Sequence, residues 1–459
     1  MAECDRWQRV FGQPNLCSLV MPDITTTQIF SDGEKGITAT KMNNIIANSV
    51  IQPDFVTAKP SSSTLDPTDQ LLEVKGAGTY ARITGSQLIS SVSAQVDATP
   101  QIYSVRLRSF NAIGNPTFEV DQRSVNGALT YPAGASNQWQ ADRWFTAKSA
   151  ATAVVTGLTG ISSAGILIPG TNFRISRSYL QYTVTTPQAT LAATEALQAI
   201  HYVEGPRWRE LASDVHSISL LCFCSVALSF AISLRDNPTT YSLVIPCSIP
   251  ANTPTLLTFP NLPLWPSGGN WSQNPGTVGY IFTICLGVGT TYQAPSTGGW
   301  VSGNYIGYSG MSNFMATSGA VFQSRYVQHE PGAVCTTPMD CPFQQNYDDC
   351  LRYYQKSYDY DVAIGTPGAV GPVSLMQNST TGTVAPIRFH KPLAKIPTCT
   401  AYNPSSGAAN SLRLGGVDYA VSSFISPGKA GFFGVNTATM PAVVAGAYGQ
   451  IHYIADTGW

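Results

Sequence analysis

The stretch between His216 and Arg235 constrains the fold of this chain more than any other feature. It holds 18 consecutive residues without a charged side chain, long enough to raise the question of a membrane-spanning helix. Every even position from Leu220 to Leu234 is apolar, whereas the odd positions are mostly Ser or Ala. Strict alternation puts the two sets on opposite faces of a strand, while a helix would mix them. The segment therefore predicts one long strand, or two strands joined by a bend, and no membrane span.

Composition supports a strand-rich fold. Charged residues make up 11% of the 459 residues, which is less than half of the roughly 25% that is usual in globular proteins. Hydrophobic residues reach 43% and aromatic residues 10%, and Ser, Thr, Asn, Gly and Pro take the place of charge. These residues suit pleated strands and tight turns better than exposed helices. A chain of this length also predicts several domains, roughly two to four.

The charge distribution excludes one class of partner and indicates another. The formal net charge is -1, and no stretch concentrates Lys or Arg. The basic surface that binds nucleic acid phosphates is therefore missing. Charged residues are depleted where subunits meet, so the sparse charge predicts that much of the surface is buried in an oligomer.

The cysteines and the N-terminus indicate a reducing compartment. Ten cysteines are present, and the close trio Cys335, Cys341 and Cys350 lacks the close pair and the fourth ligand of structural zinc sites. We expect buried free thiols and no metal centre, although a structural calcium ion stays open without an EF-hand-like run of ligands. Met1 is followed by charged residues rather than by an apolar run, so no signal peptide is expected.

The first hundred residues differ from the rest. Residues 40–50 and 86–96 predict two short helices, with Thr40 and Ser86 as N-caps. Each follows a strand-like Ile-Thr pair, which begins at Ile37 in one case and at Ile83 in the other. Such small α+β units bury too little to be stable alone, so they are expected to pack around a symmetry axis or on a partner.

Strands dominate the centre of the chain. The clearest candidates are residues 179–184, 217–234, 240–245 and 278–286. Regular strands without amphipathic helices between them predict a β-sandwich or jelly roll. Residues 265–271 and 295–305 are expected to be loops because Gly, Asn and Pro interrupt them.

One short helix is predicted near residue 350, with Asn346 as its N-cap. An apolar stripe at helical spacing supports it, made of Tyr347, Cys350, Leu351 and Tyr354. A linker rich in Gly, Pro and Val follows at residues 365–372. Strands then resume and predict a C-terminal β-sandwich as the tip of the molecule.

Several ordered segments carry a resemblance to a known family. They are residues 118–123, 141–145, 203–205, 219–227, 327–332, 336–338, 350–356, 392–402 and 454–456. Together they resemble the jelly-roll domain and tip of bacteriophage tail fibre proteins, over residues 110–459. The chain departs from the family pattern before Phe118, where Asn-Pro-Thr replaces Asn-Gly-Asp. Residues 66–88 are similar to the small adaptor elements that precede fibre shafts.

The resemblance implies a homotrimeric virion fibre with a carbohydrate-binding-type jelly roll. Residues 1–107 would then form the virion-attachment or adaptor region, and residues 108–342 the jelly roll. Residues 343–364 would hold the short helix and linker, and residues 365–459 the tip. Within the matched motifs, Trp144 is expected in the core, whereas Asp142 and Arg143 are expected to pair on the surface with little effect on stability.

Catalytic chemistry has weak support in the sequence. Glycoside hydrolysis needs two positioned carboxylates, but few acids follow the opening strands of the central region. They are Glu195, Glu204, Glu210, Asp214, Asp236 and Glu330. Asp236 and Glu330 lie in expected turns and are interpreted as structural. The five histidines are scattered, and no Gly-x-Ser-x-Gly elbow lies between a strand and a helix. We therefore expect no enzyme, no catalytic residue and no cofactor.

Aromatic residues in loops give the one positive indication of binding. They are Trp265, Trp271, Trp300, Tyr305 and Tyr308. Gly- and Asn-rich loops are a setting in which aromatic rings can stack on sugars. The alternative, somewhat favoured for any single ring, is that it plugs the end of the sandwich or a subunit interface.

Three functions compete at this stage. The leading hypothesis is a tail fibre or receptor-binding protein, which attaches to other virion proteins through its N-terminal region and presents β domains to a host surface glycan or receptor. The second is a purely structural head fibre or an adaptor that carries another fibre. The third is a polysaccharide depolymerase tailspike. The expected location is the virion, assembled in the host cytoplasm.

Overall fold

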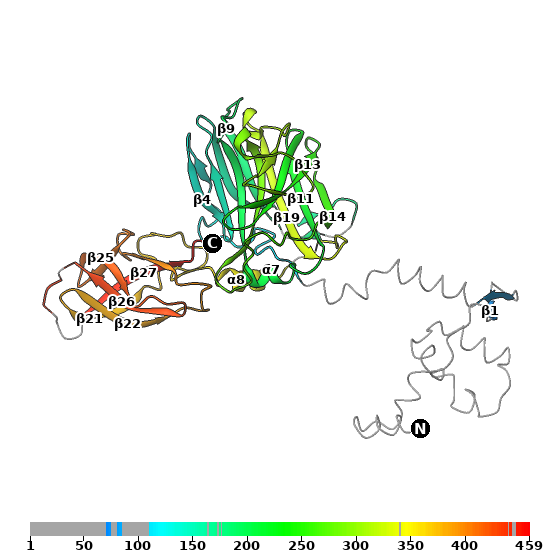
Figure 1. Cartoon of the computed structure of the whole chain (residues 1–459). Coiled ribbons are helices and arrows are strands. Elements are labelled where there is room, and N and C mark those ends of the chain that lie inside the picture. The colour runs from blue at the N-terminus through cyan, green and yellow to red at the C-terminus, as the bar shows by residue number, and fades with distance from the viewer. Residues whose placement is uncertain are drawn as a thin grey trace, which may run out of the picture. The chain divides into compact units, whose positions relative to one another are not determined.

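The computed structural model describes residues 70–74, 80–84 and 110–459, except 163–164, 172–173, 176, 339–340, 439 and 443–446. The chain divides into two compact units, Met1–Tyr103 and Ser104–Trp459, and each is described by itself (Figure 1). In the first unit, β1 (Gln70–Val74) and β2 (Tyr80–Thr84) form an antiparallel pair. The strand expected at Ile83 is confirmed, whereas the helices expected at residues 40–50 and 86–96 lie outside the described residues.

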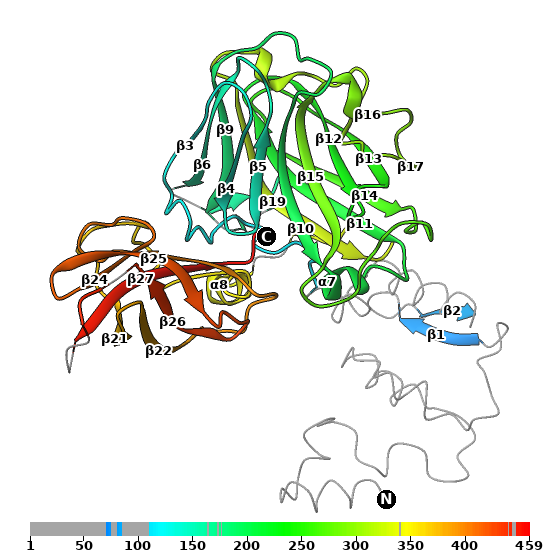
Figure 2. The ribbon, with the colours of Figure 1, turned by 60° about the vertical axis from the view of Figure 1, so that its left-hand side comes forward.

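Two antiparallel sheets form a β-sandwich in the second unit (Figure 2). The seven-stranded sheet has the order β17-β13-β12-β15-β10-β5-β4, and the six-stranded sheet has the order β14-β11-β19-β9-β6-β3. The first contains β4 (Ser136–Ala141), β5 (Trp144–Lys148), β10 (Ala196–Glu204), β12 (Leu228–Arg235), β13 (Tyr241–Ile249), β15 (Val278–Val288) and β17 (Trp300–Ser302). The second contains β3 (Leu129–Tyr131), β6 (Val154–Ile161), β9 (Ser178–Thr186), β11 (His216–Cys224), β14 (Thr255–Leu262) and β19 (Val321–Pro331). The predicted central β-sandwich is confirmed.

The uncharged segment after His216 is two strands that belong to different sheets. β11 and β12 are joined by a bend at residues 225–227, and the chain passes there from the six-stranded to the seven-stranded sheet. Even-numbered side chains such as Leu220 and Phe230 are fully buried in the core between the sheets. The odd-numbered side is covered as well, because Leu221 and Ala231 pack in separate clusters of buried residues. Burial on both faces explains why the segment carries no charge.

Trp144 lies in the core between the sheets, as predicted. It is fully buried, and its ring centroid lies 4.9 Å from that of Phe118, 5.1 Å from that of His201 and 6.2 Å from that of Phe282. Its indole Nε1 donates a hydrogen bond to the Asn115 carbonyl at 3.0 Å. The ring therefore ties the chain before β3 to β10 and β15 of the seven-stranded sheet.

Among the described residues of the second unit, two short α-helices lie outside the sheets. α7 (Gly205–Arg209) follows β10 directly, and α8 (Phe343–Cys350) is the helix that the sequence predicted near residue 350. The predicted N-cap is wrong, because α8 begins after Pro342 and Asn346 is a buried residue inside it. The predicted stripe is also too long, since Tyr354 belongs to β20 (Tyr354–Lys356), which pairs with the C-terminal strand.

The C-terminal strands close into a barrel rather than the two stacked sheets expected for the tip. They are β21 (Val373–Ser379), β22 (Gly382–Arg388), β23 (Thr398–Tyr402), β24 (Ser411–Leu414), β25 (Val417–Ile425), β26 (Gly431–Thr437) and β27 (Tyr448–Asp456). Pairing runs β27-β21-β22-β26-β25-β24, and the β24–β27 pair closes the ring. β27 also pairs with β20 and β23. Leu375, Leu412 and Ile451 are among the buried residues of the barrel's own core.

The segments between strands also carry short elements. Residues 265–271 are a loop, as predicted, but residues 295–305 contain β17, which pairs with β13 at the edge of the seven-stranded sheet. The remaining elements are β7 (Ile166–Leu167), β8 (Arg174–Ile175), η1 (Thr290–Tyr292), β16 (Gln293–Ala294), β18 (Gly307–Tyr308) and η2 (Phe314–Ala316). No helix in the described part of the chain is long and apolar enough to cross a membrane.

Candidate functional site

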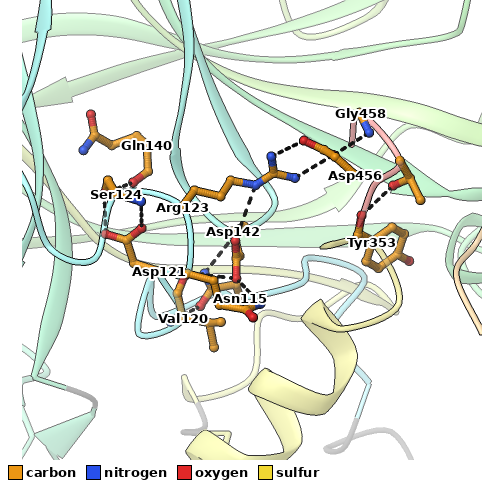
Figure 3. A network of polar contacts seen from close by, with 12 residues as sticks. Asn115, Val120, Asp121, Arg123, Ser124, Gln140, Asp142, Tyr353, Asp456 and Gly458 are labelled. Atoms are coloured by element: carbon orange, nitrogen blue, oxygen red, sulfur yellow. Dashed lines mark hydrogen bonds and ion pairs between the residues drawn. The ribbon is translucent and has the colours of Figure 1, made fainter. Parts of the chain in front are cut away.

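A network of charged and aromatic side chains joins the sandwich to the barrel. Arg123 makes two hydrogen bonds to the carboxylate of Asp456 in β27, and its Nε lies 3.5 Å from Asp142 Oδ1 (Figure 3). The guanidinium carbon lies 4.5 Å from the ring centroid of Trp139 and 4.2 Å from that of Tyr354. Segments that carry the family resemblance thus meet at this junction.

The surface pair predicted for Asp142 and Arg143 is wrong. Both residues are buried, with exposures of 1% and 2%, in the tight turn between β4 and β5, where Arg143 has a φ of 74°. Asp142 accepts a 2.7 Å hydrogen bond from Gln122 and faces Arg123, while the Arg143 guanidinium lies 3.6 Å from the ring centroid of Tyr353. Burial raises the pKa of Asp142 to about 7, although Arg123 acts to lower it.

Glu204 forms a second joint between the end of β10 and the segment after α8. Its carboxylate accepts hydrogen bonds from Arg352 Nε and Nη2 at 2.9 and 2.7 Å, and from the Tyr353 hydroxyl at 2.7 Å. The backbone N–H of Gly276 donates a further one at 2.7 Å. Burial acts to raise the pKa of Glu204, but these hydrogen bonds outweigh it and hold the pKa at about 2. A carboxylate whose oxygens accept this many hydrogen bonds stabilises the fold.

Asp236 and Glu330 are also bound by the fold, in agreement with their structural interpretation. Asp236 lies in the turn after β12, as expected, whereas Glu330 lies near the end of β19 and not in a turn. Asp236 accepts from the backbone N–H groups of Thr240 and Tyr241 at 2.6 and 2.8 Å. Glu330 accepts from the backbone N–H and the hydroxyl of Thr336, both at 2.7 Å. Their oxygens are occupied by the fold itself.

Three of the five aromatic residues proposed for sugar binding form a cluster with Trp208. The ring centroids of Trp265, Trp271 and Trp300 lie 5.0 to 5.2 Å apart, and Trp271 stacks on Trp208 at 6.0 Å. The indole N–H groups of Trp265, Trp271 and Trp300 each donate to a backbone carbonyl. The acceptors are Leu211, Pro266 and Pro263, in that order. The rings are half-buried and pack against the main core, as a plug would. Sugar stacking on their open edges stays a prediction.

A chain of buried hydrogen bonds lies under this cluster. The Pro263 carbonyl accepts from His216 Nε2 at 3.2 Å. In the neutral imidazole, His216 Nδ1 then carries no proton and can accept from His329 Nε2 at 2.9 Å. His329 Nδ1 then accepts from the Tyr280 hydroxyl at 2.5 Å. All three hydrogen bonds in this series have a donor and an acceptor when both imidazoles are neutral. Burial lowers the pKa of His216 to about 4 and the pKa of His329 well below its usual value.

The neutral histidines predict a loss of stability in acid. In the unfolded chain they bind protons near their ordinary pKa of about 6.5, whereas folded His216 does so only near 4. The contribution of His216 to the free energy of unfolding is therefore present above pH 6.5. It falls by roughly 3 kcal/mol as the pH falls toward 4. Urea unfolding at several pH values measures this change.

Asp142 provides the control for that measurement. Its folded pKa of about 7 lies above the unfolded value, so its protonation stabilises the fold as the pH falls through the same range. The variant Asp142→Asn removes this opposing contribution and should show a steeper loss in acid. A free energy of unfolding that stays level between pH 6.5 and 4.5 in both proteins would contradict the neutral histidine pair.

Tyr305 and Tyr308 lie apart from the three tryptophans. Both pack in the cluster that contains Val244 and Cys285, on the outer face of the seven-stranded sheet. The backbone N–H of Tyr305 donates to Ser242 Oγ at 2.9 Å. The two tyrosines thus help to fold the segment from residue 289 to residue 312 over this face. The structure does not bring the five proposed residues together in one site.

A cavity of about 270 Å³ lies on the outer face of the seven-stranded sheet, beside this covering segment. We call it the outer-face cavity. It is lined by Ala135, Asn137, Ala147, Lys148, Ser149, Thr194, Ala196, Gln198, Arg235, Tyr292, Asn304 and Ile306. Ala196, Arg235 and Ile306 are buried, whereas Asn137 and Asn304 are exposed. The cavity therefore has a buried floor and an open rim, and its volume lies just below the range of small-molecule sites, about 300 to 1,000 Å³.

Strand register explains why the lining side chains meet. Asn137, Ala147 and Gln198 lie directly opposite one another on β4, β5 and β10. Residues directly opposite in neighbouring strands share a face of the sheet. Arg235 is on the same face of β12, which is reached across β15. Lys148 follows Ala147 and points to the other face, where its ammonium donates to the carbonyls of Gly134 and Ala150.

Two residues that line the outer-face cavity have side-chain atoms that no hydrogen bond of the described structure uses. Arg235 Nε, Gln198 Oε1 and Ser233 Oγ are buried atoms without a hydrogen-bond partner among the described residues. The first two belong to lining residues, and Ser233 lies two positions before Arg235 on the same face of β12. None of these residues, nor Tyr292, was predicted from the sequence as part of a site. One signal was available: Arg235 is the only charge on the face of small residues that the alternation had defined.

In the described segments, no group of three His, Cys, Asp or Glu residues is arranged to hold a metal ion. Cys222, Cys224, Cys247 and Cys285 are buried free thiols. Burial raises the pKa of Cys222 and of Cys285 to about 12, so these thiols are not nucleophiles at neutral pH.

Comparison with known proteins gives structural similarities only. No protein-family model matches the chain, and no curated protein matches it significantly. TmCBM61 in complex with beta-1,4-galactotriose is 9% identical, with a TM-score of 0.24, over 49% of this chain and 99% of that one. The enzymatically active domain of tailspike protein 4 from Bacteriophage CBA120 is 10% identical, with a TM-score of 0.25, over 49% of this chain and 22% of that one.

A family 11 carbohydrate-binding module from Clostridium thermocellum, in complex with a mixed-linked tetrasaccharide, is also similar. It is 11% identical, with a TM-score of 0.22, over 45% of this chain and 100% of that one. Similarities at this level do not assign the chain to a family or a function.

Proposed function

We propose that this chain binds a host surface glycan through the outer-face cavity, as the host-facing part of a bacteriophage fibre. The observation that carries the proposal is the cavity itself, with a buried floor, an exposed rim and polar groups that lack partners. A sugar ring presents hydroxyl groups that can occupy such donors and acceptors, and the half-buried ring of Tyr292 gives it an apolar surface.

The fibre part of the proposal is supported by the sequence. The matched segments that resemble tail fibre proteins include the residues of the sandwich–barrel junction, Arg123, Asp142 and Asp456. Sparse charge favours an oligomer, for which we propose a homotrimer attached to the virion through residues 1–107. Light scattering of the full chain should give the mass of a trimer, and a monodisperse monomer would contradict it.

Binding without hydrolysis is the form of the proposal that the cavity supports. No Asp or Glu is among its lining residues, whereas glycoside hydrolysis uses two carboxylates beside the scissile bond. Three of the six acids considered above, Glu204, Asp236 and Glu330, are occupied by hydrogen bonds of the fold. Release of reducing ends from host polysaccharide by the purified protein would overturn this part.

The direct test of the proposed function is a glycan array probed with the full chain. We expect selective binding to a small group of related glycans, and stronger attachment to cells that carry the glycan than to cells that lack it. Heat-unfolded protein is the control for nonspecific adsorption. Cooperative unfolding of the same preparation would show that the protein is folded. If such protein gave no selective signal on the array, this would contradict glycan binding.

A further inference from the structure

Arg235 is a buried cation without a counterion. It is 6% exposed, and neither a salt bridge nor a carboxylate influence on its pKa is found among the described residues. Its own neighbour Asp236 is bound by the turn after β12. Charged groups are almost never buried unless they are paired, so this arrangement requires a reason.

Neutral groups fix the position of the guanidinium but do not balance its charge. Nη1 donates to Asn304 Oδ1 at 2.7 Å, and Nη2 donates to Thr283 Oγ1 at 2.9 Å. A guanidinium has five N–H groups, and Nε is among those left without an acceptor in the described structure. Burial lowers the pKa of Arg235 to about 10, so the charge is retained at neutral pH.

The cavity around Arg235 is free of negative charge. Its other lining side chains are neutral apart from Lys148, whose ammonium is bound to carbonyl groups on the other face of the sheet. Gln198 also lines the cavity, and its amide oxygen has no hydrogen-bond partner among the described residues. A planar guanidinium pairs best with a carboxylate, and its attraction for one is stronger where water is excluded.

From this geometry we infer that the outer-face cavity takes an acidic sugar, whose carboxylate pairs with Arg235 while its hydroxyl groups bind Gln198 and the rim. The inference rests on the proposed glycan binding and narrows it to uronate- or sialate-type glycans. Asn304 and Thr283 hold the guanidinium in place before the ligand arrives, which reduces the ordering that binding requires.

The test compares acidic glycans with their neutral counterparts. Full-length protein is titrated calorimetrically with oligogalacturonate and with sialyllactose, and then with carboxyl-reduced oligogalacturonate and lactose. We expect at least one acidic probe to bind at least tenfold more tightly than its neutral counterpart. In the variant Arg235→Met this preference should disappear, while thermal unfolding stays cooperative, because removing an unpaired buried charge does not strain the fold.

Arg325→Met is the matched control. Arg325 is a part-buried arginine of β19 in the other sheet, where it is hydrogen-bonded to Gln323, and its loss should leave acidic binding unchanged. If Arg235→Met does not fold, Asn304→Ala serves instead: it removes an exposed residue that holds the guanidinium, and a several-fold weaker acidic binding is expected.

The outcomes separate the inference from the proposed function. Selective binding of neutral glycans with no preference for acidic ones would overturn the inference and leave glycan binding intact. Binding to no glycan would overturn both. A change of oligomeric mass in Arg235→Met, with acidic binding unaltered, would mean that a second copy of the chain neutralises the cation, and would also overturn the inference.

Discussion

Replacing Arg123 by Ala is expected to lower the free energy of unfolding by about 3 to 5 kcal/mol, the usual effect of breaking a buried ion pair from one side. Arg123 is the cation between Asp456 of β27 and Asp142 of the β4–β5 turn. Its loss leaves Asp142, which is 1% exposed, without a counterion. It also removes the guanidinium from between Trp139 and Tyr354. Urea unfolding at pH 7.5 measures the difference.

Two further variants test whether the loss of stability comes from the buried ion pair. Arg413→Ala removes the exposed pair with Asp418, whose side chains are 34% and 42% exposed, and should cost no more than about 1 kcal/mol. In the double variant Arg123→Ala, Asp142→Asn, part of the loss should be recovered, because the buried charge is gone. Equal, small losses in Arg123→Ala and Arg413→Ala would contradict the junction as described.

Replacing Trp144 by Ala is expected to cost about 3 to 5 kcal/mol as well, for a different reason. The side chain is fully buried, so its removal leaves a cavity in the core between the sheets. The hydrogen bond to the Asn115 carbonyl is lost with it. Trp144→Phe keeps most of the packing and should lose only about 1 to 2 kcal/mol. Denaturant unfolding of both variants measures the two losses, and similar losses would show that the ring does not carry the packing.

The β fold could be predicted because alternation is a local property. The period after His216 placed the even-numbered residues from Leu220 to Leu234 on the core side. It could not show that the two strands enter different sheets, because that depends on partners elsewhere in the chain, β14 and β19 for one and β13 and β15 for the other. The barrel closure through the β24–β27 pair depends on distant pairing in the same way.

The errors at Asp142, Arg143 and Tyr354 share a physical cause. Opposite charges at adjacent positions predict a surface pair, but the turn between β4 and β5 directs Asp142 toward Arg123 and Arg143 toward Tyr353. Tyr354 continues the helical spacing of α8, yet it leaves the helix to pair with β27. In each case a contact far away in the sequence overrides a local pattern.

The candidate site was harder to predict than the fold. Aromatic residues in loops pointed to Trp265, Trp271 and Trp300, whose N–H groups are bound to backbone carbonyls. The outer-face cavity instead combines Gln198, Arg235 and Tyr292 from separate parts of the chain. These residues meet because of the strand register and the position of the covering segment. Neither can be predicted from the spacing of residues in the sequence.

The most direct test of glycan binding by the outer-face cavity is to block it. Asn137 lies on its rim and is exposed, so Asn137→Trp should fill the opening without disturbing the core. The control Thr258→Trp puts the same ring at an exposed position of β14, in the other sheet. Calorimetric titration with a glycan selected on the array should show at least about a tenfold loss of affinity, or 1.4 kcal/mol, for Asn137→Trp and no change for Thr258→Trp. Unchanged affinity in Asn137→Trp would contradict the central claim.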